Sequence, residues 1–207
     1  MAEGDPQPDR QMRADRSDIA KFAPDHLARY RWAARLAKGP VLDAGCGTGY
    51  GTSILHALHD VVIGLDISEE ALLFANENFP GPKYGLADIQ RSEVFKGVTE
   101  KFGSITCFEV IEHLERPHEA LRALYGVLDG AGALYCSVPN ENDYPFVAKT
   151  YEGEEYPHLR HYTPGQFLDL LSECGFSRIG INCQKTKVDP EIVPGDAGRT
   201  IVCVAYK

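Results

Sequence analysis

The sequence predicts an α/β fold in which a largely parallel β-sheet is covered by helices on both faces. Short apolar segments alternate with segments of helical periodicity along most of the chain, the arrangement that gives parallel strands joined by crossover helices. The last two apolar segments, 177–184 and 199–207, have no helix between them and are expected to pair antiparallel. The 207 residues, 43% of them hydrophobic, suffice for one such core.

Each expected helix has its own local signals. The first stops at Gly39 and Pro40, which interrupt helical geometry. Ser68 is placed to cap the third helix, Pro117 lies near the start of the fourth, and Thr163 begins the fifth. The helices are expected at 25–37, 50–58, 69–79, 116–132 and 163–176.

The strands are predicted from short runs of apolar, β-branched and aromatic residues. A loop that contains Pro190, Pro194, Gly195 and Gly198 is expected between the last two of them. Seven strands are expected, at 40–45, 60–68, 83–89, 103–110, 133–140, 177–184 and 199–207.

The chain is expected to form a single domain over 17–207, preceded by a flexible, polar tail over 1–16. Segment 139–162 is long for a connection and rich in Tyr and Phe, so we expect a functional lid insertion there. The six cysteines are scattered without a paired motif, as in proteins with reduced, buried thiols. With neither a secretory signal nor an apolar run long enough to span a membrane, a cytoplasmic location is expected.

The formal net charge of −9 makes nucleic acid an unlikely partner, because proteins that follow a phosphate backbone normally present a basic surface. A small-molecule partner is therefore favoured.

A glycine-rich loop, "DAGCGTGYG", follows the first expected strand. Its glycines Gly45, Gly47, Gly49 and Gly51 alternate, whereas a dinucleotide loop requires the spacing G-x-G-x-x-G. Asp43 precedes them at the expected mouth of the loop, where a carboxylate would repel a pyrophosphate but suit an ammonium or sulfonium group. The loop is thus predicted to bind a positively charged nucleoside without phosphate.

With these residues, "VLDAGCGTG" resembles the first motif of the class I S-adenosylmethionine-dependent methyltransferases. The resemblance continues through "VIGLDIS", "LADI", "FEVIEHLERP" and the terminal strand pair, and so covers nearly the whole chain. It implies a Rossmann-like, seven-stranded sheet and an enzyme that binds S-adenosylmethionine and releases S-adenosylhomocysteine.

The resemblance also implies roles for particular residues. Asp66 would accept hydrogen bonds from both ribose hydroxyls, and Asp88 would accept one from the adenine amino group. Ile67 and Ile89 would enclose the adenine, and Tyr30 or Arg31 would reach the methionine carboxylate. The implied cofactor-binding residues are Asp43, Gly45, Cys46, Gly47, Gly49, Asp66, Ile67, Asp88, Ile89, Glu109 and Tyr30.

The segment "EVIEH" is expected to begin a helix after the fourth strand. Glu109, Glu112 and His113 would then share one face at the ligand-binding edge of the sheet. Two carboxylates and an imidazole there suggest either a general base, with His113 as the first candidate and Glu112 beside it, or a site for a divalent metal. A purely structural or cofactor-lining role is the third alternative.

Two narrower families share this segment. One comprises the O-methyltransferases of ubiquinone biosynthesis and their relatives, and it favours an oxygen of a small molecule as the acceptor. The other comprises the small-RNA 3′-end 2′-O-methyltransferases, in which E-x-x-E-H and a later histidine hold a metal. That likeness implies a metal at Glu109, Glu112, His113 and His158, although the longer D-H-x-F-E-W-T block of that family is absent.

The primary hypothesis is therefore a methyltransferase for a small-molecule acceptor, most simply an O-methyltransferase. The alternatives are a metal-dependent RNA 2′-O-methyltransferase and a non-catalytic binding protein with the same fold. In the lid segment, Tyr144, Phe146, Tyr151 and Tyr156 are expected either to pack on the acceptor or to pack on one another. His161 is either a further site residue or a loop histidine.

Overall fold

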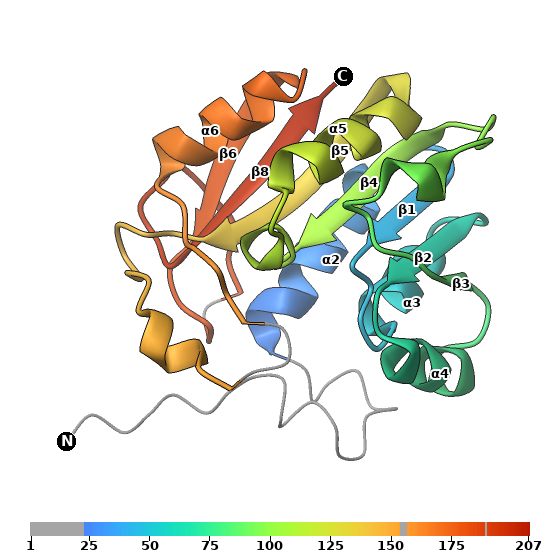
Figure 1. The fold of residues 1–207 in the computed structure, drawn as a ribbon, viewed down its shortest axis with the longest axis horizontal. Coiled ribbons are helices and arrows are strands. Elements are labelled where there is room, and N and C mark those ends of the chain that lie inside the picture. Colours follow the sequence, from blue (N-terminus) through green and yellow to red (C-terminus); the bar gives the residue numbers. More distant parts are fainter. Residues whose placement is uncertain (1–22, 154–156, 189) are drawn as a thin grey trace.

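The structure, a computed structural model, describes residues 23–153, 157–188 and 190–207; the tail expected at 1–16 lies outside these ranges. One eight-stranded sheet crosses the described chain in the order β3-β2-β1-β4-β5-β8-β6-β7 (Figure 1). Its strands are β1 (Val41–Ala44), β2 (Val62–Asp66), β3 (Lys83–Leu86), β4 (Phe102–Phe108), β5 (Leu128–Pro139), β6 (Ser177–Gln184), β7 (Val193–Pro194) and β8 (Thr200–Tyr206).

The helices start at the capping residues expected from the sequence. Ser68 accepts a hydrogen bond from the backbone N–H of Ala71, and Thr163 forms a reciprocal capping box with Gln166. The α-helices are α2 (Pro24–Leu36), α3 (Tyr50–His56), α4 (Glu69–Asn78), α5 (Pro117–Val127) and α6 (Pro164–Glu173). Three 3₁₀-helices are η2 (Ser92–Phe95), η3 (Ile111–His113) and η4 (Ala148–Tyr151).

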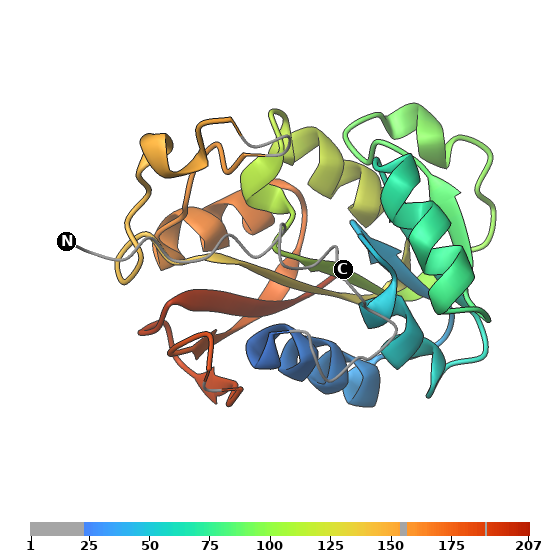
Figure 2. The same ribbon diagram turned by 90° about the horizontal axis from the view of Figure 1, so that it is seen from below.

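Helices cover both faces of the sheet, as predicted. Figure 2 shows α2 and α3 on one side of the strands and α5 and α6 on the other. A hydrophobic cluster fills each layer: Tyr30, Leu55 and Phe108 belong to the first, and Leu121 and Phe167 belong to the second. All six cysteines are buried and none forms a disulfide, as expected.

The strand directions confirm the predicted class. β3, β2, β1, β4 and β5 pair in parallel, whereas β8 runs antiparallel to both β5 and β6. The carboxyl ends of β1, β2 and β4 therefore meet at one edge, where the chain order reverses between β1 and β4 and where open α/β sheets bind ligands.

The structure differs from the expected elements in two places: one strand was missed, and one helix–strand boundary was wrong. The loop between the last two predicted strands contains an eighth strand, β7, which pairs with β6 opposite Asn182 and Cys183. The helix expected to extend to residue 132 ends at Val127, and β5 begins five residues earlier than predicted. Leu128 is buried and pairs with Phe102 of β4, so tertiary pairing overrides the helical pattern there.

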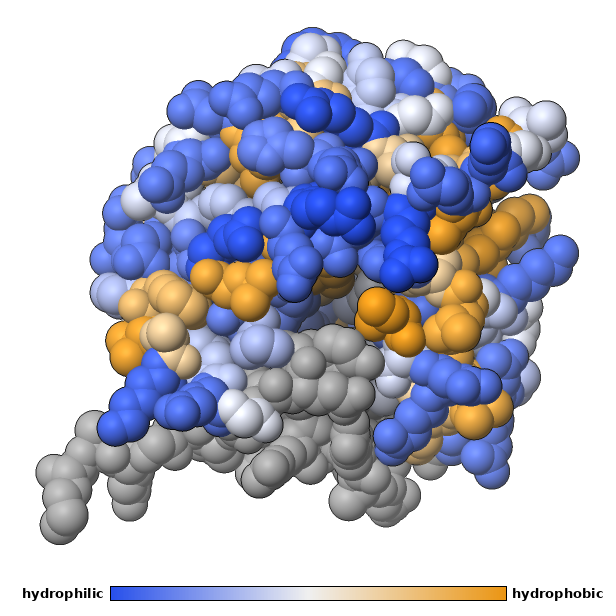
Figure 3. Space-filling view, in the orientation of Figure 1, coloured by the Kyte–Doolittle hydropathy of each residue, from blue (hydrophilic) through white to orange (hydrophobic). Residues whose placement is uncertain are grey.

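On the face shown in Figure 3, apolar side chains form separate small groups among polar ones. The exposed large apolar residues are correspondingly spread over several elements, among them Leu36 of α2, Leu73 of α4 and Leu159 before α6. Among the described residues, the helices are too short or too polar to cross a bilayer.

Candidate functional site

The glycine loop connects β1 to α3, and the space around its glycines differs from one to the next. Gly45, Gly47 and Gly49 all have positive φ angles, of 81°, 51° and 83°, which favour glycine. A Cβ atom on Gly45 would lie 2.3 Å from Val110, and one on Gly49 would lie 2.6 Å from Ala75. A Cβ atom on Gly47 would meet nothing within 4 Å. The loop is thus packed at both ends and open in front of Gly47, where a ligand can approach the backbone.

Asp66 ends β2 beside this opening. Its Oδ2 accepts a hydrogen bond from the N–H of Gly47 at 2.7 Å, and its Oδ1 accepts one from the N–H of Ser68 at 2.9 Å. Each carboxylate oxygen can accept a second hydrogen bond, and the side chain is only half-buried. The position therefore suits the two ribose hydroxyls expected there.

Asp43 lies beneath the glycine loop, and the expectation that it stands at the mouth of the loop was wrong. Its carboxylate is fully buried and accepts hydrogen bonds from the hydroxyls of Thr52 and Thr106 at 2.7 Å and of Tyr30 at 3.2 Å. Tyr30 is itself buried, so it does not present its hydroxyl to a cofactor carboxylate as expected. Cys46 is also buried. These residues support the loop from behind.

This burial makes the stability of the protein depend on the ionisation of Asp43. Burial raises the pKa of Asp43 from 3.8 to about 6, although three hydroxyl hydrogen bonds act in the opposite direction. The folded state therefore holds this proton more tightly than the unfolded state, and the stabilisation present below pH 3.8 is lost as the pH rises through about 6.

Asp43→Asn removes this titration. In urea denaturation, the free energy of unfolding of the wild type, relative to that of the variant, is expected to fall by about 2 kcal/mol between pH 4 and pH 7. Replacing the exposed Asp60 with Asn is the control and should leave that pH dependence in place. A constant wild-type advantage over Asp43→Asn across this range would contradict the raised pKa.

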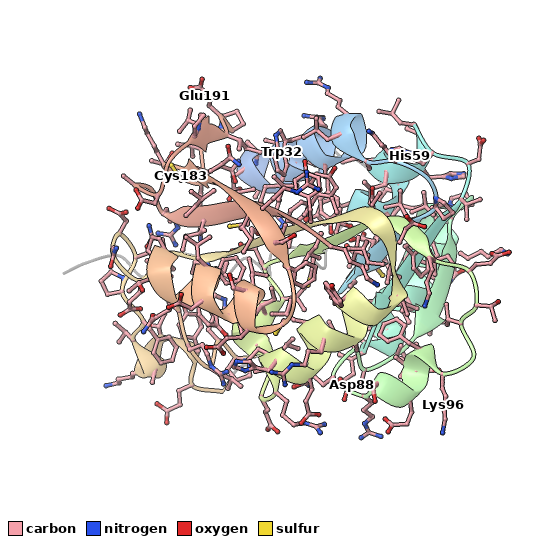
Figure 4. The ribbon with its side chains drawn as sticks, turned by 90° about the horizontal axis from the view of Figure 1, so that it is seen from above. Trp32, His59, Asp88, Lys96, Cys183 and Glu191 are labelled. Atoms are coloured by element: carbon pink, nitrogen blue, oxygen red, sulfur yellow. The ribbon has the colours of Figure 1, made fainter. Side chains whose placement is uncertain are left out.

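The residues expected around the adenine differ in their exposure. Ile67 is 52% exposed after β2, whereas Ile89 belongs to the hydrophobic core, and the enclosure of the adenine by these side chains stays a prediction. Asp88 lies at the outer edge of the fold, across the sheet from Trp32 of α2 (Figure 4). It accepts hydrogen bonds from the backbone N–H of Gln90, and its Oδ2 lies 3.3 Å from Nε of Arg91.

Glu109 does not share a helical face with Glu112 and His113, although the sequence predicted that it would. Its φ angle of 53° is in the left-handed region, and the helical segment that follows is only the short η3. Its Oε1 accepts a hydrogen bond from the hydroxyl of Ser137 on β5 at 2.7 Å. A non-glycine residue with this backbone at the ligand-binding edge of the sheet is typical of functional sites.

The other three residues of the expected metal set converge. Glu112, His113 and His158 each offer a potential ligand atom, and these atoms all lie within 4.8 Å of one another. The Glu112 side chain is fully buried, and neither of its oxygens has a hydrogen-bond partner among the described residues. Nδ1 of His113 likewise has none. We call these three residues the Glu112 cluster.

The charges of the Glu112 cluster are perturbed by its surroundings. Burial, followed by the charge of Glu109, raises the pKa of Glu112 well above its ordinary value. Burial, followed by the neighbouring His113 and His161, lowers the pKa of His158 to about 3. A buried carboxyl group without a partner and a neutral imidazole lie together, and such perturbed groups concentrate at functional sites.

The Glu112 cluster lies beside the glycine loop. Val110 packs against Gly45 and is followed two residues later by Glu112. His158 reaches the cluster from the lid segment, where the N–H of Leu159 donates a hydrogen bond to the carbonyl oxygen of Glu112 at 2.9 Å. The lid segment and the glycine loop therefore meet beside η3.

The aromatic residues of the lid segment pack largely on one another. Phe146 stacks on Tyr151 at a ring-centroid distance of 5.7 Å, and the hydroxyls of Tyr144 and Tyr151 lie 3.2 Å apart. Tyr151 also stacks on His158 at 4.3 Å. Tyr156 lies outside the described residues. This arrangement supports the alternative in which these aromatic residues pack on one another. It also holds the His158 ring in place through Tyr151.

Arg29 was missed in the sequence. Its side chain is fully buried, and Nη1 lies 2.7 Å from Oε1 of Gln184 and 3.4 Å from Oδ2 of Asp25. Its Nε and Nη2 groups have no hydrogen-bond partner among the described residues. The spacing of Asp25, Arg29 and Ala33 on one inward stripe of α2 was the available signal. Unsatisfied buried donors on a cation favour an anionic ligand group.

The sheet order, the open glycine loop and the acidic residue at the end of β2 are typical of α/β domains that bind ligands at the carboxyl ends of their strands. The family of methyltransferase domains matches residues 12–179, and the chain belongs to this family. This confirms the family expected from the sequence, the S-adenosylmethionine-dependent methyltransferases.

Two curated relatives and one solved structure illustrate the similarity. A ubiquinone biosynthesis O-methyltransferase of Glaesserella parasuis is 33% identical over 107 residues, 48% of this chain and 45% of the relative. A probable S-adenosylmethionine-dependent methyltransferase of Mycobacterium tuberculosis is 28% identical over 159 residues, 75% of this chain and 55% of the relative. The chain thus spans about half the length of these relatives.

The structural comparison shows the same fold. A possible histamine N-methyltransferase of Thermotoga maritima superposes with a TM-score of 0.67 at 20% identity, covering 91% of each chain.

Proposed function

We propose that this protein transfers the sulfonium methyl group of S-adenosylmethionine to a hydroxyl oxygen of a small-molecule acceptor. The observation that carries the proposal is the buried, unpartnered carboxyl group of Glu112, which lies with two imidazoles beside the cofactor loop. The name of the ubiquinone-biosynthesis relative supports an oxygen acceptor, and that of the Thermotoga maritima neighbour, a possible histamine N-methyltransferase, names nitrogen as the alternative atom.

The cofactor side of the proposed site uses three groups. The ribose hydroxyls would bind Asp66, and the methionine portion would pass in front of Gly47, where the backbone is open. The methionine carboxylate would satisfy the Nε and Nη2 groups of Arg29, replacing Tyr30 in the role expected from the sequence. In this placement, the ligand carboxylate would share the buried guanidinium with Asp25, whose Oδ2 lies 3.4 Å from Nη1.

The acceptor side supplies a base. The sulfonium carbon is already electrophilic, so catalysis consists of aligning the hydroxyl with it and removing the hydroxyl proton. Glu112 is the proposed proton acceptor, because a pKa raised by burial brings a carboxylate closer to the basicity that general-base catalysis at neutral pH requires. His113 would orient the acceptor through Nδ1. The sequence had suggested His113 as the first candidate for the general base; the proposal gives that role to Glu112 and a positioning role to His113.

The same donors fit a divalent metal ion. One carboxylate and two imidazoles are ligands that zinc, manganese and iron accept, and the two unpartnered oxygens of Glu112 would be satisfied by a cation. Glu109, whose Oε1 is bonded to Ser137, is outside this set. A bound cation would lower the pKa of a coordinated acceptor hydroxyl.

The proposed function is tested with tritium-labelled S-adenosylmethionine and matched phenols, catechols, carboxylic acids and amines. Transfer to a hydroxyl oxygen is the expected result, identified by mass spectrometry of the product; transfer confined to amines would contradict it. The assay is repeated after dialysis against EDTA. Loss of turnover that manganese or zinc restores would support the metal, and unchanged turnover would leave Glu112 acting alone as the base.

A further inference from the structure

His161 and His158 are joined by a chain of hydrogen bonds that begins at a backbone carbonyl group. Nδ1 of His161 lies 2.7 Å from the carbonyl oxygen of Tyr144. A carbonyl oxygen can only accept, so Nδ1 of His161 carries a proton. The His161 ring is buried, and burial favours the uncharged form of an imidazole. A neutral ring protonated on Nδ1 has its lone pair on Nε2.

That lone pair points to His158. Nε2 of His161 lies 2.9 Å from Nδ1 of His158, and two lone pairs facing each other at this distance would repel. Nδ1 of His158 must therefore be the donor, and a neutral His158 ring with its proton there has its lone pair on Nε2. The hydroxyl of Tyr151 also contacts Nε2 of His161, at 3.2 Å, and it lies equally close to the hydroxyl of Tyr144.

The orientation of the His158 ring is fixed separately from its tautomer. Tyr151 stacks on it with an interplanar angle of 9°, and the His113 ring meets it at 87° with centroids 4.6 Å apart. Stacking holds the ring plane but does not select which nitrogen carries the proton. The hydrogen bond that joins Nδ1 of His158 to His161 makes that selection.

We infer that His161 is a positioning residue that fixes His158 as the Nδ1–H tautomer. The Nε2 lone pair of His158 is thereby kept available within the Glu112 cluster. A lone pair on this nitrogen is what is needed to accept a proton or to bind a metal ion. The inference deepens the proposed function and rests on it for its catalytic consequence, while the tautomer itself stands on the hydrogen-bond chain alone.

Two substitutions at residue 161 separate the tautomer from structure. The amide of His161→Gln can place its oxygen near the position of Nε2 and accept from His158, whereas that of His161→Asn reaches only the position of Nδ1. Nitrogen-15 spectra of histidine-labelled protein distinguish protonated from unprotonated ring nitrogens, and His158→Gln identifies the His158 signals by their loss. The wild type and His161→Gln are expected to show Nδ1–H at His158, and His161→Asn a mixture of tautomers.

Turnover is expected to fall about 10- to 100-fold in His161→Asn, with unchanged cofactor affinity, and to recover in His161→Gln. A wild-type His158 protonated on Nε2, or an unchanged tautomer in His161→Asn, would overturn the inference. If no acceptor hydroxyl is methylated but the tautomers behave as stated, the proposed function fails while the assignment of His161 as the residue that sets the tautomer holds.

Discussion

Replacing Asp66 with alanine is expected to weaken the binding of S-adenosylhomocysteine by about 10²-fold, because two charge-assisted hydrogen bonds to the ribose are lost. The carboxylate also holds the open part of the loop through the N–H of Gly47, so the variant loses a pre-formed site as well. Isothermal titration calorimetry of the purified protein measures the change. Binding that is unaltered in Asp66→Ala would refute the ribose assignment.

Two further variants show which part of the cofactor each residue binds. Glu70→Ala removes an exposed acidic residue from the first turn of α4 and should leave affinity unchanged. Arg29→Met should weaken S-adenosylhomocysteine but not methylthioadenosine, which keeps the ribose and lacks the carboxylate. Asp66→Ala should weaken both ligands. Equal losses of both ligands in Arg29→Met would contradict the carboxylate assignment.

The fold was predictable because its signals are local. The strand–helix alternation, the Ser68 cap and the Thr163 capping box are all contained within a few residues, and each appears in the structure. The two errors come from strand pairing, which the local pattern of each segment does not reveal. β7 exists because Val193 pairs with Cys183, and β5 begins early because Leu128 pairs with Phe102.

The candidate site divides in the same way. Asp66 and the glycines follow their strands directly, so the sheet edge places them together. The burial of Asp43 depends on Thr106, 63 residues away, and that of Arg29 depends on Gln184, 155 residues away. Such contacts leave no periodic signal in the sequence.

The Glu112 cluster was predicted in part, for a reason that concerns one backbone angle. The i, i+3, i+4 spacing assumes a regular helix from Glu109, but the left-handed conformation of that residue breaks the phase. Glu112 and His113 keep their mutual arrangement within η3, and the lid segment brings His158 to them. The spacing argument therefore holds after the turn and fails across it.

Replacing Glu112 with glutamine is expected to lower the rate of methyl transfer by about 10²- to 10⁴-fold, the usual contribution of a general base. The amide has nearly the shape of the carboxyl group but cannot take a proton from the acceptor. Cofactor affinity should remain unchanged, because Glu112 is not among the groups proposed to bind S-adenosylmethionine. Single-turnover kinetics with saturating cofactor isolates the transfer step. Glu115→Gln, at an exposed acidic residue three positions later, is the matched control.

The stability of the same variant provides an independent test. Because burial raises the pKa of Glu112 in the folded state, the wild type loses stability as the pH rises through that raised pKa, and Glu112→Gln does not. The variant should therefore unfold at the same temperature as the wild type or higher at neutral pH, so that reduced turnover cannot be attributed to unfolding. Undiminished turnover in Glu112→Gln would remove Glu112 as base and as metal ligand. A lower melting temperature of the variant at neutral pH would instead show that the ionised carboxylate has a stabilising partner, as a bound cation would provide.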